Sequence, residues 1–226
     1  MSLLFVSLLV GRGSRRRVSV AARLVLAGAL VAPLVNCTST QRTGNSPAYL
    51  IIDAMSAAAG VTPDKQFSSL PSDVLTLVKQ QINGKEVLVP TIFQDPGHVN
   101  FRLALKDPGT VDSALSPSSN NFITVNRYHV KFIRADGHNV QGVDVPYEFD
   151  GTMSLTVNTG GGEIGFTLVR AQAKAEAPLA ALAGTNASYT ISTLAEVTFY
   201  GFDQAGHVVS VVGHIGVDFA DWGDPQ

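Results

Sequence analysis

Apolar and polar residues alternate with a period of two through most of the chain after residue 48, and no other feature restricts the fold as strongly. Residues 98–106 show the alternation clearly, because every second side chain is apolar: Val99, Phe101, Leu103 and Leu105. Residues 152–157 and 163–170 repeat it. A strand of this period turns one face to a core and the other to water. The pattern therefore predicts a half-buried antiparallel sheet.

Turn residues separate the predicted strands. Gly160-Gly161-Gly162 joins residues 152–157 to 163–170, and because glycine readily adopts positive φ, these segments predict a hairpin. Asn83-Gly84, the preferred dipeptide of a type I′ turn, predicts a second hairpin from residues 74–82 and 86–93. In its first arm, Val74, Leu77 and Val78 also fit one face of a helix, so helix and strand both remain open there.

Two further segments depart from simple alternation. In residues 122–134 the apolar side chains change parity, so a β-bulge near Asn126-Arg127 is expected to keep both halves facing the core. Asp136-Gly137 then turns the chain. Residues 171–184 are rich in alanine, which is uncommon in strands, and they predict a short helix or turn after Pro178.

The C-terminal part predicts the longest hairpin, from residues 192–202 and 207–219. The Asp203 carboxylate is expected to accept hydrogen bonds from amides of the turn, and Gly206 to take the left-handed conformation that closes it. Residues 200–207 are similar to the D-x-A-G-N turn before the last strand of bacterial immunoglobulin-like domains, with His207 in place of the asparagine. With the alternation and the lack of βαβ units, this resemblance predicts an all-β fold, a single immunoglobulin-like antiparallel β-sandwich of eight or nine strands.

The first 37 residues have a different composition. An apolar run, residues 24–35, follows five arginines: Arg12, Arg15, Arg16, Arg17 and Arg23. As a helix this run would be about 18 Å long, against about 30 Å of bilayer hydrocarbon. It is too short for a permanent span, and a basic segment before a short apolar one is typical of an export signal. Residues 1–37 are therefore predicted to be a signal peptide with a signal helix.

The end of this segment, Leu34-Val35-Asn36-Cys37, resembles the lipobox of bacterial lipoprotein precursors, although Asn36 replaces the small residue of that motif. The resemblance implies that diacylglycerol is attached to the Cys37 thiol and anchors the protein to a membrane. In these families an aspartate after the cysteine often retains the protein at the inner membrane. Thr38 at that position implies the outer membrane of the cell envelope. The alternative is an ordinary signal peptide followed by a free thiol.

Composition limits what the remainder can be. Residues 38–47 are polar and small, and they predict a flexible tether before a single domain of residues 48–226. Without the five leader arginines, 11 of the 16 basic residues remain against 18 acidic ones, a formal charge of −7. Nucleic-acid binding needs a basic face, so this charge argues against a nucleic-acid partner. Cys37 is the only cysteine, which excludes an internal disulfide.

No group of residues has the spacing of a familiar catalytic or metal motif. The five histidines are scattered, no G-x-S-x-G motif is present, and no cofactor is predicted. Asp218, Asp221 and Asp224 offer carboxylate oxygens to a calcium ion, or else form a solvated acidic tail. Trp222 and Tyr200 offer an aromatic platform for a glycan, or else Trp222 packs on the domain as a C-terminal anchor.

Two classes of function follow from these features. The first is a lipid-anchored, non-enzymatic binding or structural module of the cell envelope, whose sheet face or edge strand binds a protein, peptide or glycan. The second is an exported hydrolase whose site is built from loops. The resemblance to immunoglobulin-like modules, which commonly serve adhesion and assembly, favours the first. A cleft with convergent polar side chains would indicate the enzyme, and an open edge or exposed apolar patch the binder.

Overall fold

The computed structural model describes residues 44–223, so the signal segment, Cys37, residues 38–43 and Asp224 lie outside the described residues. The described residues belong to one compact unit, and strands dominate it. The strands are β1 (Ala48–Ala57), β2 (Ser69–Asp73), β3 (Thr76–Ile82), β4 (Lys85–Thr91), β5 (Asp95–Leu105), β6 (Gly109–Thr110), β7 (Ser113–Ala114), β8 (Ile123–Ile133), β9 (Phe149–Val157), β10 (Gly162–Val169), β11 (Ile191–Asp203) and β12 (Val208–Ala220). The helical segments are η2 (Ser119–Asn121), α3 (Ala171–Ala175) and η3 (Leu179–Leu182).

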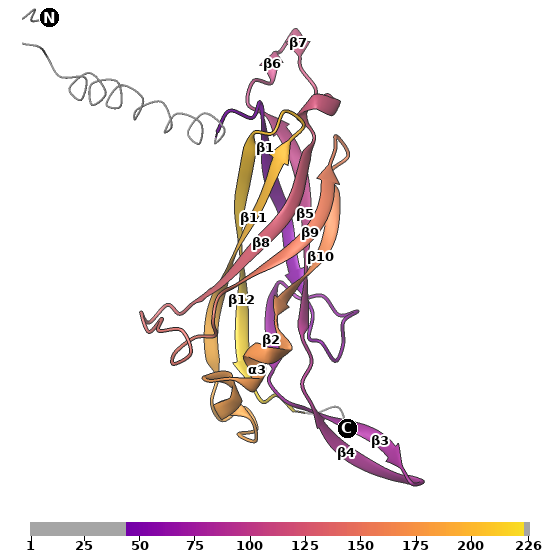
Figure 1. Ribbon diagram of the computed structural model, residues 1–226, viewed down its shortest axis with the longest axis vertical. Coiled ribbons are helices and arrows are strands. Elements are labelled where there is room, and N and C mark those ends of the chain that lie inside the picture. Colours follow the sequence, from indigo (N-terminus) through magenta and orange to yellow (C-terminus); the bar gives the residue numbers. More distant parts are fainter. Residues whose placement is uncertain (1–43, 224–226) are drawn as a thin grey trace, which may run out of the picture. The chain divides into compact units, whose positions relative to one another are not determined.

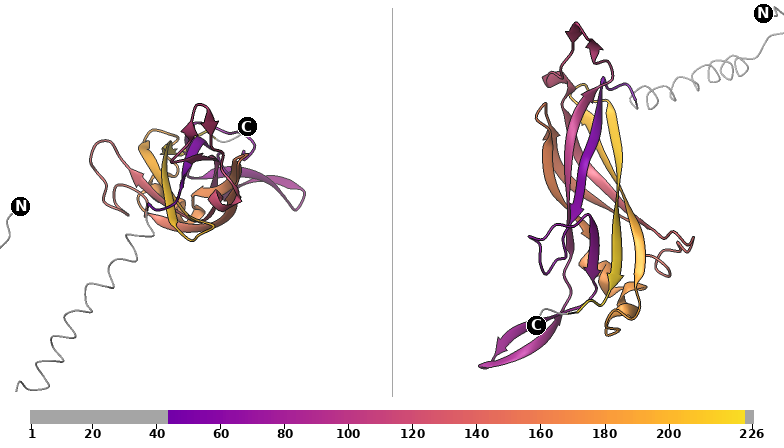
Figure 2. Two further views of the ribbon diagram at one scale, coloured as in Figure 1. Left: turned by 90° about the horizontal axis from the view of Figure 1, so that it is seen from above. Right: turned by 180° about the vertical axis from the view of Figure 1, so that it is seen from behind.

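Two sheets make up most of the structure (Figures 1 and 2). One has the strand order β1–β5–β10, and the other has the order β2–β12–β11–β8–β9. The all-β prediction is confirmed, but the prediction of only eight or nine strands, all antiparallel, is wrong. β2 runs parallel to β12, and it was missed because its sequence, Ser-Leu-Pro-Ser-Asp, has the composition of a loop. Pro71 is tolerated there because β2 lies at the edge of its sheet.

The core lies between the two sheets, where aromatic side chains from both meet. The Phe199 ring of β11 packs edge-on against Phe101 of β5 and Phe166 of β10, with centroids 5.0 and 5.4 Å apart. Tyr128 of β8 adds a polar link, because its hydroxyl accepts a hydrogen bond of 3.2 Å from the backbone N–H of Thr167 in β10. Burial of these large apolar side chains stabilises the pairing of the sheets in a domain without a disulfide.

The predicted hairpin of residues 152–157 and 163–170 is wrong, although both strands exist. β9 and β10 belong to different sheets and share only the isolated bridge between Asn158 and Gly161. Gly161 has the expected positive φ, 82°. The apolar sides of both strands face one core from opposite sides, so the turn carries the chain from one sheet to the other.

The predicted bulge in β8 is confirmed. In the pairing of β8 with β11, Val125 and Arg127 lie opposite the adjacent residues Gly201 and Tyr200, so Asn126 is an extra residue. Val125 and Tyr128 on either side of it are both buried. On the neighbouring strand β11 the same irregularity falls at Gly201, where a Cβ atom would overlap the carbonyl oxygen of Thr124. The extra residue therefore keeps both halves of β8 facing the core and requires glycine on the strand beside it.

Two predicted hairpins are confirmed. Asn83 and Gly84 connect β3 to β4 with φ values of 53° and 74°, as a type I′ turn requires, so the helical alternative for Leu77 and Val78 is wrong. β3 and β4 pair only with each other among the described strands, and Figure 1 shows their ribbon extending away from the two sheets. β11 and β12 form the long C-terminal hairpin. The short helical segment predicted after Pro178 is η3, and α3 precedes it.

Candidate functional site

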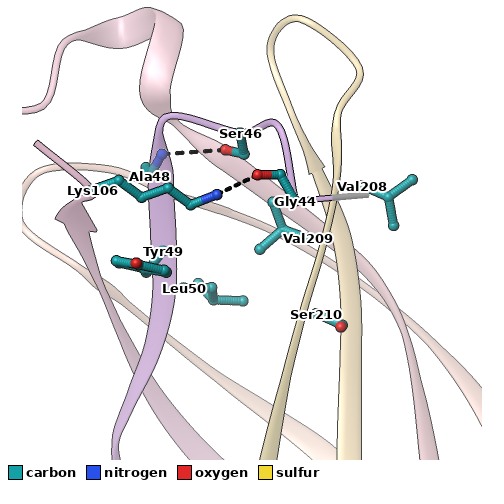
Figure 3. A pocket seen from close by; sticks show the side chains of 9 residues that line it. All are labelled: Gly44, Ser46, Ala48, Tyr49, Leu50, Lys106, Val208, Val209 and Ser210. Carbon is teal, nitrogen blue, oxygen red and sulfur yellow. Dashed lines mark hydrogen bonds between the residues drawn. The ribbon is translucent and has the colours of Figure 1, made fainter. Parts of the chain in front are cut away.

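A pocket opens where β1 of one sheet lies beside β12 of the other (Figure 3). Its volume is about 240 Å³. We call it the edge pocket, and its walls are Gly44, Ser46, Ala48, Tyr49, Leu50, Lys106, Val208, Val209 and Ser210. Two of these residues, Gly44 and Ser46, come from the predicted tether. Ser46 is buried, and the carbonyl oxygen of Pro47 accepts a hydrogen bond of 2.9 Å from the N–H of Lys106.

The first half of β12 has a strand partner on one side only. β11 pairs with β12 from Val208 to Phe219, whereas β2 covers only Gly216–Ala220 on the other side. The Asp203 N–H donates a hydrogen bond of 3.0 Å to the His207 carbonyl oxygen, so Asp203 and His207 are a hydrogen-bonded pair of the β11–β12 ladder. Hydrogen-bonded and non-hydrogen-bonded pairs alternate along an antiparallel ladder. In that alternation the N–H and C=O groups of Val208, Ser210 and Val212 point away from β11, toward the side on which β1 lies.

The facing edge of β1 is arranged in the same way. The hydrogen bond from Lys106 N–H to Pro47 O marks Pro47 and Lys106 as a hydrogen-bonded pair of the β1–β5 ladder. Because such pairs alternate with non-hydrogen-bonded ones, the backbone groups of Leu50 and Ile52 point away from β5. No ladder joins β1 to β12 in the part of the chain that the structure describes. The edge pocket therefore lies between two strand edges whose backbone donors and acceptors have no strand partner.

This open stretch ends at Gly213. A Cβ atom there would overlap the sulfur of Met55 and approach the Ile52 side chain, so β1 and β12 pack tightly at this level. The accessible part of the β12 edge is consequently limited to Val208–Val212, next to the edge pocket.

Apolar side chains surround this accessible edge. Tyr49 is 52% exposed, Val208 42% and Val212 46%, and Phe202, directly opposite Val208 in the ladder, is 40% exposed. The Lys106 amine donates a hydrogen bond to the Gly44 carbonyl and lies 5.5 Å from the centre of the Tyr49 ring. The rim thus combines exposed apolar surface with one fixed positive charge, a combination typical of interaction sites.

The turn between β11 and β12, beside the edge pocket, contains a hydrogen-bonded cluster centred on Asp203. The buried Asp203 carboxylate accepts hydrogen bonds of 2.9 Å from the N–H groups of Ala205 and His207, and its other oxygen lies 2.8 Å from His207 Nδ1. Burial by itself would raise the pKa of Asp203, but the hydrogen bonds from His207, Ser46 and Ala205 together lower it. The predicted turn is confirmed, with Gly206 at φ 83°.

This group bears on the predicted hydrolase. In a serine hydrolase the hydroxyl bonds the imidazole, and the acid bonds the other side of the ring. Here Ser46 and His207 both bond the same carboxylate. That arrangement fixes the N-terminal segment to the β11–β12 turn, but it does not place the Ser46 hydroxyl on a base.

A second polar cluster, not anticipated from the sequence, lies in the core. The Lys174 amine of α3 donates hydrogen bonds to Asp95 of β5, at 2.8 Å, and to the Asp73 carbonyl of β2, at 2.7 Å. Ser72 Oγ and Gly60 N–H also donate to the Asp95 carboxylate, at 2.6 and 2.8 Å. Burial raises the pKa of Asp95, and the charge of Lys174 opposes that effect. Because every oxygen has a donor, the cluster acts as a structural tie between three elements.

The structure describes two of the three predicted calcium ligands, Asp218 and Asp221. The buried Asp221 carboxylate accepts a hydrogen bond of 2.7 Å from Gly184 N–H, so it holds the loop after η3 and is not part of a solvated tail. Asp224 lies outside the described residues. Within residues 44–223 no three His, Cys, Asp or Glu side chains form a group able to hold a metal ion.

The structure also separates the two members of the predicted aromatic platform. Tyr200 pairs with Ser210 near the β11–β12 turn, and the Arg127 guanidinium stacks 4.2 Å from the centre of its ring. Trp222 follows the opposite end of β12, and at about 3.3 Å per residue the strand from Ser210 to Ala220 alone is about 33 Å long. The backbone N–H of Trp222 donates to the Asp73 carboxylate, at 3.0 Å, which matches the alternative of a C-terminal anchor.

Comparisons with protein-family models, with curated proteins and with solved structures found no match. Between residues 44 and 223, no helix is long and apolar enough to cross a membrane. The functional assignment therefore rests on the geometry of the edge pocket and on the sequence of the leader.

Proposed function

We propose that the protein is a lipid-anchored, non-enzymatic binding module of the cell envelope, held at the outer membrane through Cys37. We further propose that it captures an extended peptide segment of a partner protein along the open edge of β12. The observation that carries this proposal is the run of unpartnered backbone groups at Val208, Ser210 and Val212 directly beside an apolar pocket.

An extended peptide fits this site because it can bond the open backbone groups of β12 and also place a side chain in the edge pocket. Its backbone would pair with the outward N–H and C=O groups of β12 and so add a strand to the five-stranded sheet. Every second side chain would then turn toward the edge pocket, where Tyr49, Leu50 and Val209 favour an apolar group. The Lys106 amine at the rim favours an acidic or carbonyl group close by.

The strand order supports an immunoglobulin-like identity for the fold. In such sandwiches the first, second, fifth and fourth strands form one sheet in that order, and the third, sixth and seventh form the other. The order β1–β5–β10 corresponds to the first, second and fifth strands, and β12–β11–β8 to the seventh, sixth and third. β9 is an added strand beside β8, and the fourth strand has no counterpart among the described strands. β2 then corresponds to a continuation of the first strand that crosses to pair with the last one.

The anchoring part of the proposal is tested by removing the thiol. We expect the wild-type chain in the membrane fraction, with a Cys37 mass increased by acyl groups, and Cys37→Ala in the soluble fraction. A free thiol in the processed protein, or unchanged partitioning of the variant, would contradict the lipid anchor.

The binding part is tested by photo-crosslinking in intact cells, with a photoreactive residue at Val208. We expect an adduct that persists in Ser210→Ala and disappears in Ser210→Pro. Proline removes an N–H that points away from β11, so the β11–β12 ladder keeps its bonds while the edge loses a donor. An adduct equally strong in both variants would mean that the partner does not pair with this edge.

A further inference from the structure

We propose that the end of the domain with the β6–β7 hairpin rests on the membrane, and that the Val111 side chain at the hairpin tip inserts into the lipid interface. This inference rests on the lipid anchor of the proposed function and deepens it. It adds an orientation of the domain and a direct contact between the folded chain and a zwitterionic lipid surface.

The start of the described chain is fixed to this end of the domain. The Gly44 carbonyl accepts a hydrogen bond from the Lys106 amine, Ser46 is buried, and the Pro47 carbonyl accepts a bond of 2.9 Å from the Lys106 N–H. Seven residue steps separate Cys37 from Gly44, and fully extended they span at most about 25 Å. An anchor at Cys37 therefore holds this end of the domain close to the membrane.

The β6–β7 hairpin belongs to the same end. Figures 1 and 2 show it projecting beyond the start of β1. Val111 follows Lys106 by five residues, which span at most about 18 Å, so the tip lies within reach of a membrane that holds Cys37. The opposite end of the domain is much more distant, because β12, with 13 residues, is about 40 Å long. The end with β6 and β7 is therefore the end nearer to the anchor.

The tip of this hairpin is apolar and uncovered. The pairing of β6 with β7 leaves Val111 and Asp112 as the two turn residues. Such positions usually carry Gly, Asn, Asp or Ser, yet Val111 is 102% exposed, more than any other large hydrophobic side chain in the described part of the chain. Leu115, 56% exposed, lies beside Gly109 at the base of the hairpin. The hairpin thus holds two apolar side chains in water.

The size of this contact favours a lipid surface over a protein partner. A stable protein interface buries roughly 1,200–2,000 Å², which two side chains on a two-residue turn do not approach. Insertion into a lipid interface needs no such minimum, because its strength scales with whatever apolar area is buried. The short segment after Cys37 also holds the tip at high effective concentration beside the bilayer, so a weak contact is sufficient.

The charge of the tip selects the kind of lipid. Asp112 is the only charged side chain between Pro108 and Asn121. Asp107, just before this segment, accepts a hydrogen bond of 3.0 Å from the Gly109 N–H. Anionic lipids attract basic segments, and this tip has no basic residue. A zwitterionic surface therefore fits it better than an anionic one.

Fluorescence quenching in vesicles tests the inference. The acylated full chain is reconstituted in phosphatidylcholine vesicles with a fluorophore on Val111→Cys, or on the matched control Val140→Cys. Val140 is 61% exposed in the segment after β8, whereas Val111 precedes β8. Cys37 does not react, because its sulfur carries the lipid. With spin-labelled lipid in the bilayer we expect loss of fluorescence at position 111 and none at position 140. Equal quenching at both positions, or none at 111, would overturn the proposal.

A second set of variants separates insertion from simple proximity to the bilayer. The fluorophore is placed on Leu115→Cys, and Val111 is changed to serine or to isoleucine. The Val111 side chain is fully exposed, so neither change disturbs the fold. We expect Val111→Ser to abolish the quenching, because a hydroxyl does not favour the lipid interface, and Val111→Ile to retain it. Quenching that survives Val111→Ser would contradict insertion of the tip.

Flotation of the same vesicles distinguishes failure of this inference from failure of the proposed function. A chain that floats with an unquenched fluorophore at position 111 retains the anchor and overturns only the inference. A chain that does not float has no lipid anchor and contradicts both. Peptide binding at β12 does not affect either result, because the vesicles contain no partner protein.

Discussion

Lys174 lies almost completely buried, with 1% of its side chain exposed, and its amine joins α3 to both sheets through Asp95 and Asp73. A charge in such a place is tolerated because its partner is equally buried and both oxygens of the Asp95 carboxylate accept hydrogen bonds. The cluster therefore makes the position of α3 depend on a single side chain.

Removing that side chain tests the dependence. Lys174→Met leaves the Asp95 carboxylate buried without a counter-charge, so we expect it to lower the free energy of unfolding by about 3–5 kcal/mol. The double variant Lys174→Met/Asp95→Asn removes both charges and is expected to recover most of that loss. Denaturant titration measures all three proteins, and a single variant no less stable than the double one would argue against an ionised pair.

Asp203 predicts how stability depends on pH. Its pKa is lowered in the folded protein, so its contribution is fully present above the unfolded value, about 3.9, and is lost as the pH falls through the folded value. We therefore expect the stability difference between wild type and Asp203→Asn to be constant near neutral pH and to shrink below about pH 4. Unfolding curves at a series of pH values measure it, and a difference that grows on acidification would show the opposite shift.

Asp203 and Lys174 show which side-chain contacts can be predicted from the sequence and which cannot. The role of Asp203 was predictable because its donors lie within four residues, and the turn signature places them. The pair of Lys174 and Asp95 was not, because 79 residues separate them and neither has a local signal beyond an isolated charge. The burial of Asp221 was not predictable either, because the donor to its carboxylate, Gly184, is also remote in sequence.

Among the elements, β8 and β11 depend on each other at the bulge. Gly201→Ala would push a methyl group into the backbone of Thr124, which cannot yield without breaking the β8–β11 pairing. We expect a loss of about 1–3 kcal/mol. Gly223→Ala is the matched control, since nothing lies near its Cβ position, and thermal unfolding compares the two. Equal stability of both variants would mean that the strands can separate at the bulge without cost.

The strands that the sequence revealed are those with their own alternation, such as β5, β8 and β12. β2 was missed because its five residues become a strand only through pairing with β12, far along the chain. The turn between β9 and β10 was predicted correctly, but the sequence did not show that it carries the chain from one sheet to the other. Alternation shows which side of a strand is apolar, and it does not show which sheet the strand joins.

In the whole molecule, the strand edge that carries the proposed function lies at β12, beside the edge pocket. The all-β class was predictable because alternation recurs across the domain. The candidate site was not, because an open edge depends on which strands end a sheet and on how far β2 extends along β12. The leader carries the prediction of a lipid anchor independently of the fold.

Hydrogen exchange of the β12 amides, compared between the purified chain and the chain in its native envelope, tests the central claim most directly. In the purified chain, the outward amides of Ser210 and Val212 should exchange quickly, and those of Val209 and Val211, bonded to β11, slowly. In the envelope we expect Ser210 and Val212 to become protected while Val209 and Val211 do not change. If Ser210 and Val212 exchange as quickly in the envelope as in the purified chain, no peptide occupies the edge and the proposed function is wrong.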